Sequence, residues 1–527
     1  MRDWSLPRAA TSAVVVAWVA LWTATGHGQL SPTPAARTMI LDTGLPAIDR
    51  GLRDQDPPRA ARTARDADRI RAGSGDTLPY VRGSIIVKFK DDASRSGISA
   101  ATAQVAGALA DRSSSADFDI LAIPANADPE GAAAAMRQRA DVEYAQPRYL
   151  NHAMARPNDT LYSNQWNFPA IDMERVWDIQ PGASSSIIVA VLDSGMAFRT
   201  VTLRYNSRTP YRPTPGGPIY PPLGLVDVPF AAAPELGPSG STRFVSPRDF
   251  IWNDNMPLDL DGHGTHVAGT IGQLTNNNSG TVGMAYNVRL MPVKVIQGLW
   301  DEVFDSPFQG TDDVVARGVR YAADNGANVI NLSIGREDGG PATVVTDAIR
   351  YAVGRGCFVV VASGNTRADG NQQNRLAQGA PQIDGMVSVG AVGRSLDLAF
   401  YSTTGPYVEL SAPGGDQRVG QGGTSSGILQ QTLDPDQLET YTRPLSQYGP
   451  PRADVFAYEF FQGTSMATPH VSGFAALLMQ QGITNPAAIE AAMKQFATDK
   501  GIAGRDDSFG FGLINPRATL RGLGLAR

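Results

Sequence analysis

The spacing of hydrophobic and polar positions divides the chain into two differently patterned parts, with the change near Pro157. Beyond it, wholly apolar stretches alternate with longer segments of helical spacing. This alternation predicts a mainly parallel, doubly wound α/β sheet with helices on both faces. Ligands of such sheets bind beyond the carboxyl ends of the strands. We expect strands within 186–195, 288–296, 328–335, 357–365 and 386–393, and helices within 266–274, 311–327 and 345–356.

Residues 79–152 have a shorter alternation, which predicts a small α+β unit. Apolar strands are expected within 83–92, within 116–125 and from 142 onward, with helices over 99–110 and 129–140. Residues 29–78 are rich in Pro, Arg, Asp and Ala without a sustained apolar period, so we expect a disordered linker there. The Pro- and Gly-rich stretches 197–260 and 414–458 interrupt the later pattern and predict surface insertions.

The first 28 residues have the layout of a secretory signal. Arg2 and Arg8 precede an apolar stretch around 14–21, and small residues follow it. An uncleaved membrane anchor is the alternative, but the apolar stretch is shorter than the roughly 20 residues that a span requires. We therefore expect a secreted protein, extracellular or periplasmic, that has no membrane contact once the signal is removed.

Composition narrows the possible functions. The 527 residues include 42% hydrophobic and 18% charged residues, enough for more than one buried core. A formal net charge of -6 provides no basic surface for nucleic acid. Cys357 is the single cysteine, so no internal disulfide can form, and an exported chain must be stabilised by its core, by bound ions or by both.

A serine among small residues is the first candidate for chemistry. Ser465 lies in the stretch EFFQGTSMATPHVSGFAALL, and a serine nucleophile needs a base. The α/β-hydrolase arrangement requires the order Ser, acid, His, but the histidine that follows, His470, leaves no room for an intervening acid. His263 and His266 could form a metal pair, yet the zinc-protease helix spaces its histidines at i, i+4 with a glutamate between them.

An aspartate supplies the remaining partner. Asp193 ends the apolar strand within 186–195, where burial without hydrogen bonds would be costly; a helix cap is the alternative explanation. The segments VAVLDSG, GHGTHVAGT and GTSMATPHVSG, in the order Asp, His, Ser, resemble the motifs of the subtilisin-like (subtilase, S8) serine proteases over about 160–520. The resemblance implies that Ser465 is the nucleophile, His263 the general base and Asp193 the acid that orients it.

The same resemblance implies further site residues. Asn365 matches the side-chain donor of the oxyanion hole. Ser333, Ile334 and Gly335 match the edge that pairs with the substrate backbone, and Ala362, Ser363 and Gly364 match a wall of the specificity pocket. The family often binds structural calcium through oxygen ligands, and the matching positions are Gln165, Leu274, Asn277, Ser279 and Thr281.

The small unit resembles the ferredoxin-like propeptide of the family, which acts as folding template and inhibitor. An independent binding domain is the alternative. Self-cleavage would then fall within about 149–160. The implied organisation is a signal over 1–28, a linker over 29–78, a propeptide over 79–152 and a peptidase domain over 153–527.

The sequence thus predicts a secreted serine endopeptidase made as an autoprocessed zymogen. Its partners would be polypeptide substrates and its own propeptide, without nucleic acid, and we expect a monomer. A peptide-binding pseudoprotease and an acyl-transferring ligase or cyclase are the alternatives, and the second would use the same residues. If His263 is the base, activity should fall on the acid side with an apparent pKa of roughly 6 to 7.

Overall fold

The computed structural model describes residues 80–112, 117–149, 156–212 and 216–524. The predicted signal and linker lie outside the described residues, and so do residues 150–155 of the predicted cleavage segment. The small unit and the large unit are described separately below.

The small unit is a four-stranded antiparallel sheet with two helices. Its strand order is β2-β3-β1-β4, and Ile85, Leu121 and Met136 are buried in its core. This β-α-β-β-α-β succession has the ferredoxin-like arrangement, so the predicted fold is confirmed. The elements are β1 (Tyr80–Phe89), α2 (Arg95–Gln104), β2 (Ala108–Arg112), β3 (Asp119–Ala122), α3 (Pro129–Arg137) and β4 (Val142–Tyr149).

One expectation for the small unit is wrong. The helix predicted over 99–110 ends at Gln104, and the residues from Ala108 onward form strand β2. Ala106 has a φ of 49°, and a side chain on Gly107 would lie 2.9 Å from the carbonyl oxygen of Ala122. Pairing with β3 therefore overrides the helical preference of the alanine-rich stretch.

The large unit is organised around a seven-stranded sheet in which every pair of neighbouring strands is parallel. Strands that were expected from their apolar runs are buried on both faces, as a parallel sheet requires. Across the sheet, the strands are β13 (Leu410–Pro413), β12 (Met386–Val392), β11 (Phe358–Ala362), β10 (Val329–Leu332), β5 (Ile188–Asp193), β9 (Arg289–Lys294) and β8 (Arg248–Asp249).

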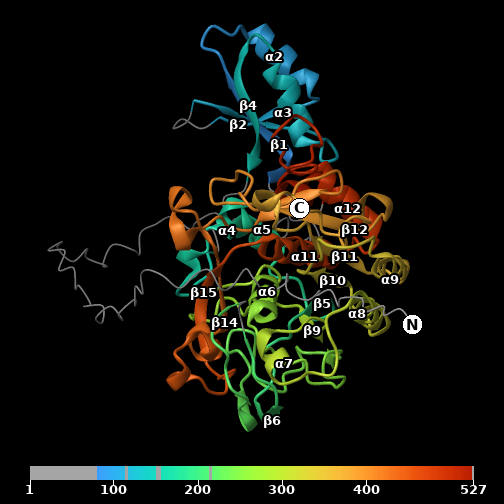
Figure 1. Ribbon diagram of the computed structural model, residues 1–527. Coiled ribbons are helices and arrows are strands. Elements are labelled where there is room, and N and C mark those ends of the chain that lie inside the picture. The colour runs from blue at the N-terminus through green and yellow to red at the C-terminus, as the bar shows by residue number, and fades with distance from the viewer. Residues whose placement is uncertain (1–79, 113–116, 150–155, 213–215, 525–527) are drawn as a thin grey trace, which may run out of the picture. The chain divides into compact units, whose positions relative to one another are not determined.

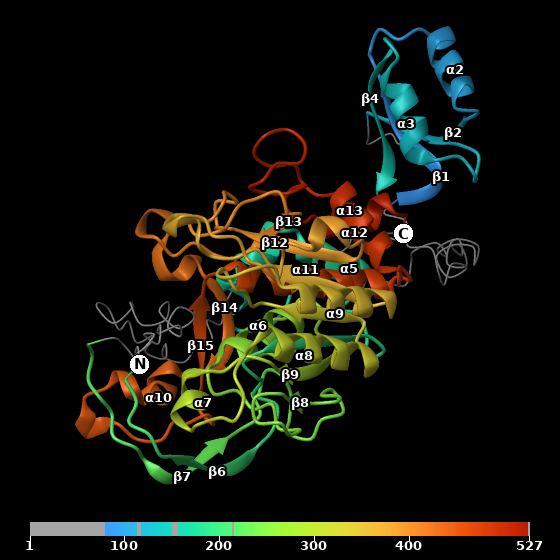
Figure 2. The ribbon, with the colours of Figure 1, turned by 45° about the vertical axis from the view of Figure 1, so that its right-hand side comes forward.

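Helices cover both faces of this sheet. Val189 and Val191 of β5 belong to the core that includes α6 (His263–Gly272) and α11 (Thr464–Gln480). Ala190 and Leu192 belong to the opposite core, which includes α8 (Asp312–Asp324) and α9 (Thr343–Gly354). Figures 1 and 2 both show α8 and α9 side by side, with α11 on the other side of the strands. The predicted doubly wound sheet is confirmed.

The two predicted insertions contain antiparallel hairpins. The first is formed by β6 (Val201–Ser207) and β7 (Gly224–Phe230), and the second by β14 (Ile428–Leu433) and β15 (Phe456–Phe461). Tyr205 of the first insertion stacks on Phe304 with centroids 4.6 Å apart, and Tyr220 joins the two insertions through Tyr448, with centroids 4.8 Å apart. The remaining helices are α4 (Asn167–Ala170), α5 (Met173–Ile179), α7 (Leu299–Val303), α10 (Pro435–Leu438), α12 (Pro486–Gln495) and α13 (Pro516–Gly522), with short 3-10 turns between elements.

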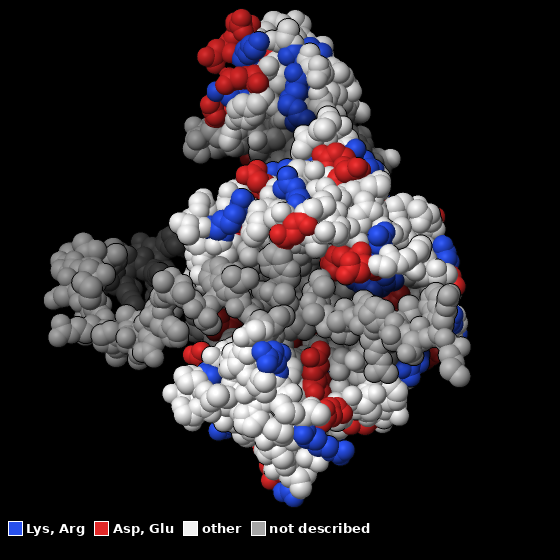
Figure 3. Space-filling model, viewed as in Figure 1, with Lys and Arg blue, Asp and Glu red and all other residues white. Residues whose placement is uncertain are grey.

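On the face drawn in Figure 3, the described acidic and basic side chains are interspersed, and no broad basic field marks a nucleic-acid surface. Within the described ranges, no helix is long and apolar enough to cross a bilayer.

Candidate active site

The carboxyl end of β5 presents Asp193. The residue is fully buried, and its Oδ1 accepts a hydrogen bond from the backbone N–H of Ser194 at 2.7 Å. The same oxygen lies 2.7 Å from Nδ1 of His263. A buried carboxylate in contact with an imidazole fixes the ring so that Nδ1 carries the proton and Nε2 is left to accept one.

His263 begins helix α6, and its side chain remains about a quarter exposed, at 26%. The next residue, Gly264, brings the helix against the turn after β5. A side chain there would lie 2.1 Å from the carbonyl oxygen of Gly195 and 3.1 Å from Cβ of Asp193. The glycine is therefore required for the helix to approach close enough to join the imidazole to the carboxylate.

Asp259 ties the same two segments together. Its Oδ1 accepts hydrogen bonds from Ser194 Oγ and from the backbone of Gly262, and its Oδ2 accepts two from Thr265. Ser194 follows Asp193, and Thr265 lies in the first turn of α6. Asp259 is thus a positioning residue. Its role could not be predicted from the sequence, because nothing about an aspartate in a loop indicates which residues it will bond to.

Ser465 is the second residue of α11. Its Oγ donates to the carbonyl oxygen of Ser333 at 3.0 Å, while Ser333 Oγ donates to the carbonyl oxygen of Ser465 at 2.8 Å. Ser333 follows β10, the strand beside β5. These bonds place the serine at the carboxyl edge of the sheet, next to the strand that ends in Asp193.

Asn365 lies just beyond β11 and is oriented by the residue before the serine. Its Oδ1 accepts hydrogen bonds from the backbone N–H of Thr464 at 2.9 Å and from Thr464 Oγ1 at 3.0 Å. Both bonds hold the carbonyl side of the amide, so the NH₂ side is left to donate elsewhere. A side chain on Gly463, the residue before α11, would lie 3.6 Å from Nδ2 and 3.8 Å from Oδ1, so the amide packs beside the entrance to this helix.

The two segments predicted to contact substrate are held together by a residue that was not predicted. Buried Asn374 donates to the carbonyl oxygen of Ile334 at 3.1 Å and to that of Ala362 at 2.7 Å. Gly335 is exposed, and a side chain there would meet Asn374 Nδ2 at 2.7 Å. Ser363 is buried and its carbonyl oxygen accepts from Tyr407, so the remaining wall is fixed as well.

Negative charge surrounds His263. Burial alone would lower the pKa of the imidazole, but the neighbouring Asp193 carboxylate outweighs it, and Asp261 and Asp259 add to the effect, so the pKa is raised above its ordinary value of 6.5. Burial and the charge of Asp259 raise the pKa of Asp261 to about 6. Burial and Asp261 raise the pKa of Glu439, from the second insertion, to about 7.

The two other histidines of the motifs are buried in the frame of the site. His266 Nε2 lies 3.0 Å from the carbonyl oxygen of Ile428 and 3.1 Å from that of Glu459, so this nitrogen donates to both strands of the β14–β15 hairpin. Its ring stacks on Phe461, and burial lowers its pKa to about 3. His470 Nδ1 lies 2.9 Å from the carbonyl oxygen of Met466, and burial lowers the pKa of this histidine to about 4.

The predicted calcium ligands have protein partners in the structure. Gln165 Oε1 accepts from the backbone N–H of Val282, and its Nε2 donates to two carbonyl oxygens, so its amide clamps distant backbone segments. Thr281 Oγ1 is bonded to Gln273, and the backbone N–H of Leu274 donates to the carbonyl oxygen of Glu235. Asn277 and Ser279 donate to the Glu235 carboxylate. Among the described residues, no group of three or more His, Cys, Asp or Glu side chains could hold a metal.

Comparisons with known proteins agree with this arrangement. A model of the subtilase family matches residues 184–512, and a model of the fervidolysin N-terminal prodomain matches 66–148. The thermophilic serine proteinase of Bacillus sp. (strain AK1) is 32% identical over 441 residues, which are 83% of this chain and 86% of the relative. Subtilisin DY of Bacillus licheniformis is 32% identical over 300 residues, 56% of this chain and 89% of the relative.

A solved protease structure from Pseudoalteromonas arctica has a TM-score of 0.50 and 26% identity; the match covers 70% of this chain and 99% of that one. The doubly wound sheet, the site at its carboxyl edge and the prodomain match define a serine endopeptidase made as a zymogen. The chain belongs to the subtilase family.

Proposed function

We propose that Ser465 is the nucleophile, His263 the general base and Asp193 its orienting acid, with Asn365 donating to the oxyanion. The observation that carries the proposal is the 2.7 Å contact between Asp193 Oδ1 and His263 Nδ1. The bonds from Thr464 to Asn365 support the role of the amide, because they occupy its carbonyl oxygen and leave its NH₂ group as the donor.

The reaction would proceed in two halves. The Ser465 hydroxyl leaves its bond to the Ser333 carbonyl oxygen, gives its proton to His263 Nε2, and its Oγ forms a bond to the scissile carbonyl carbon. The resulting oxyanion is stabilised by Asn365 Nδ2 and the Ser465 backbone N–H. The C–N bond then breaks, and the leaving amine takes the proton from His263. Water attacks the acyl-enzyme by the same proton route and regenerates the serine.

Substrate would bind as an added strand beside residues 333–335. The exposed Gly335 and the bridge from Asn374 to the 362–364 segment support this role, because they keep a rigid edge open beside Ser465. None of Ala362, Ser363 and Gly364 carries a charge, so the wall itself gives no preference for a charged side chain.

We further propose secretion, with a signal over 1–28, a linker over 29–78, a propeptide over 79–152 and removal of the propeptide by Ser465 itself. The test is the mass and amino-terminal sequence of the purified wild type beside Ser465→Ala, both expressed without the signal. We expect the wild type to lose about 120 residues, the linker and the propeptide, and the variant to keep its small unit. Two full-length products would contradict self-processing, and labelling of Ser465 by an organophosphonate would then test the nucleophile separately.

We also propose that calcium binds at the loop 274–281. Asp159 accepts from the backbone N–H of Asn276, and Glu235 accepts from Ser279, so two carboxylates already face this loop. Oxygen ligands of this kind suit calcium, as do the amide, hydroxyl and backbone carbonyl oxygens of the predicted ligands. We expect calcium to raise the unfolding temperature of Ser465→Ala protein, and the added substitution Glu235→Gln to abolish the increase. A calcium response that survives this substitution would place the ion elsewhere.

A further inference from the structure

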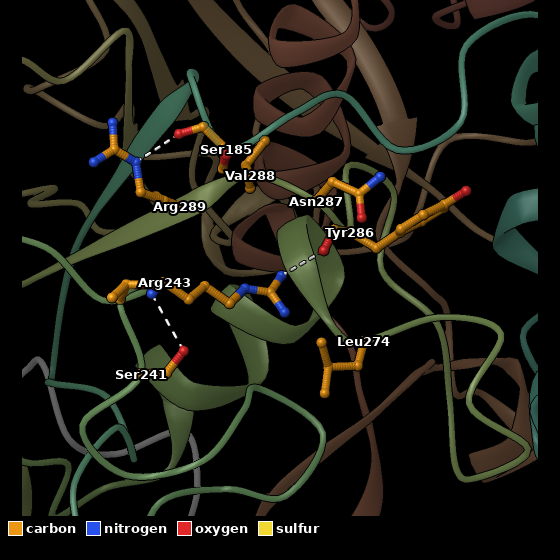
Figure 4. Close-up of a pocket in the computed structure, with 9 residues that line it drawn as sticks. Ser185, Ser241, Arg243, Leu274, Tyr286, Asn287, Val288 and Arg289 are labelled. Atoms are coloured by element: carbon orange, nitrogen blue, oxygen red, sulfur yellow. Dashed lines mark hydrogen bonds between the residues drawn. The ribbon is translucent and has the colours of Figure 1, made fainter.

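A cavity lies at the amino ends of the parallel strands, whereas Asp193 lies at their carboxyl ends. Its volume is about 470 Å³. Ser185 precedes β5 and Arg289 begins β9, whereas Asp193 ends β5, so the cavity opens where these strands start. Cavities of this size hold small organic molecules. The lining residues, shown in Figure 4, are Ser185, Ser241, Thr242, Arg243, Leu274, Tyr286, Asn287, Val288 and Arg289.

Arg243 places a guanidinium at the centre of this lining, between Tyr286 and Leu274 (Figure 4). Its Nη2 donates to the carbonyl oxygens of Tyr286, at 2.8 Å, and of Gly272. Its Nε and Nη1 are buried and make no hydrogen bond to any described residue. Burial lowers the pKa of Arg243 to about 10, and no neighbouring carboxylate counteracts it. The fold therefore keeps a cation below the surface without a counter-charge, which is costly.

Capping of α6 accounts for only part of this arrangement. Gly272 is the last residue of α6, and a guanidinium on its carbonyl oxygen satisfies a helix C-terminus. Capping uses Nη2 alone, however, and leaves the other two donor nitrogens unpaired. A neutral side chain could cap as well without the cost of burying a charge.

The rest of the lining is also suited to an anion. None of the nine residues is Asp or Glu, although the whole chain has a formal charge of -6. Arg289 adds a second guanidinium, whose Nε donates to the carbonyl oxygen of Ser185 at 2.6 Å. Within the described part of the chain, neither Arg243 nor Arg289 forms an ion pair. Ser241 and Thr242 contribute hydroxyl groups, and Tyr286 and Leu274 contribute an apolar wall.

We propose that this cavity binds a small anion through its phosphate or carboxylate group, with Arg243 as the ion-pair partner. The two N–H groups of Nη1 and the N–H of Nε are the donors left for an anion, and a small turn of the guanidinium brings them to its oxygens as charge-assisted hydrogen bonds. The hydroxyls complete the recognition, and the apolar wall accommodates the remainder of the molecule. The site is remote from Ser465 and does not depend on the proposed peptidase mechanism.

The test is calorimetric titration of the full-chain Ser465→Ala protein with inorganic phosphate and, separately, with acetate, at constant ionic strength. We expect saturable binding of at least one anion, weakened at least tenfold by Arg243→Gln, because a buried charge-assisted pair is lost. Tighter binding of phosphate identifies phosphate as the group, and tighter binding of acetate identifies carboxylate. The control is Arg350→Gln, on an exposed arginine paired with Asp347, and it should bind like the parent.

A second variant keeps Arg243 and its capping bonds. Thr242→Glu places a carboxylate on the cavity wall, where it would pair with the guanidinium and compete with the added anion. We expect weaker anion binding and a higher unfolding temperature without anion. Absence of saturable binding in the parent protein, or equal binding in the parent, Arg243→Gln and Thr242→Glu proteins, would show that Arg243 only caps the helix.

Discussion

Thr464 orients the side chain of Asn365, and single substitutions at these two positions can measure how much each contributes to activity. Asn365→Ala removes the proposed oxyanion donor, and in subtilisin, the type enzyme of the family, loss of the comparable donor costs roughly 100- to 1000-fold in kcat. We expect a loss of that order with little change in KM, because the oxyanion forms only after binding. Steady-state kinetics on a peptide substrate measure both parameters.

Thr464→Val is the matched control for Asn365→Ala. It keeps the Asn365 amide and the backbone bond to it, but removes the bond from Oγ1. We expect a fall in kcat of roughly tenfold, since one hydrogen bond contributes about 1 kcal/mol. If the two variants lose kcat equally, orientation by Thr464 is as important as the donor itself; if neither loses it, Asn365 is not the donor.

The charge of Asp261 should influence the pH below which activity is lost. Its carboxylate is one of the charges that raise the pKa of His263, and it disfavours loss of the imidazole proton. Asp261→Asn should therefore lower the pKa of His263 and move the acid limb of the kcat/KM profile to lower pH. Asp347→Asn, on the remote helix α9, is the control. A limb that stays in place in Asp261→Asn protein would show that solvent screens this charge.

Residues within the motifs could be predicted from the sequence, while their supporting partners could not. Asp193, His263 and Ser465 each lie in a short stretch whose spacing is informative by itself. Asp259 and Asn374 are identified only by their partners, which come from distant parts of the chain and meet through folding. The bonds of Gln165 could not be predicted for the same reason, since the atoms bonded to its amide lie far along the sequence.

The first insertion can be tested as an element. Ser207 of β6 pairs with Gly224 of β7, so residues 208–223 can be replaced by Asn-Gly, a two-residue turn that suits a hairpin. The replacement removes Tyr220 from its contact with Tyr448 of the second insertion. We expect an altered cleavage profile on a peptide library, with organophosphonate labelling of Ser465 retained. We propose on this basis that the first insertion borders the substrate cleft, and an unchanged profile would contradict this proposal.

Most elements of the sheet follow from apolar periodicity, because both faces of a parallel strand are buried. The exceptions lie where pairing overrides local preference. Strand β2 forms from an alanine-rich stretch because its edge pairs with β3, and the strands of the first insertion pair with each other and, at Phe230, with Ala453. Neither pairing can be inferred from the local sequence, since register depends on the partner strand.

At the scale of the whole molecule, a buried carboxylate at the end of β8 should couple stability to pH. Burial raises the pKa of Asp249 to about 7 from an ordinary value of 3.8, and its Oδ2 has no hydrogen bond to a described residue. The folded state therefore binds this proton more tightly than the unfolded state. Its contribution to stability is complete below about pH 3.8 and is lost as the pH rises through about 7.

The measurement is urea unfolding of Ser465→Ala protein between pH 4 and 8, with and without Asp249→Asn. We expect the substitution to flatten the fall in unfolding free energy over this range, because asparagine does not titrate. Parallel curves for the two proteins would show that Asp249 is ionised in the folded state throughout. The hydrogen bonds from the backbone of Ile251 and Trp252 to Oδ1 can be kept by the asparagine oxygen.

The link from His266 to both strands of the β14–β15 hairpin has a consequence for protein engineering. α6 carries His263, and β15 leads directly into the turn before Ser465. Because His266 of α6 bonds to both strands, His263 and Ser465 are held by the same end of this hairpin. The far end of that hairpin, at 444–447, is exposed. A foreign domain or a fluorescent reporter grafted there should leave the catalytic distances intact, which makes this tip a natural attachment point for new modules.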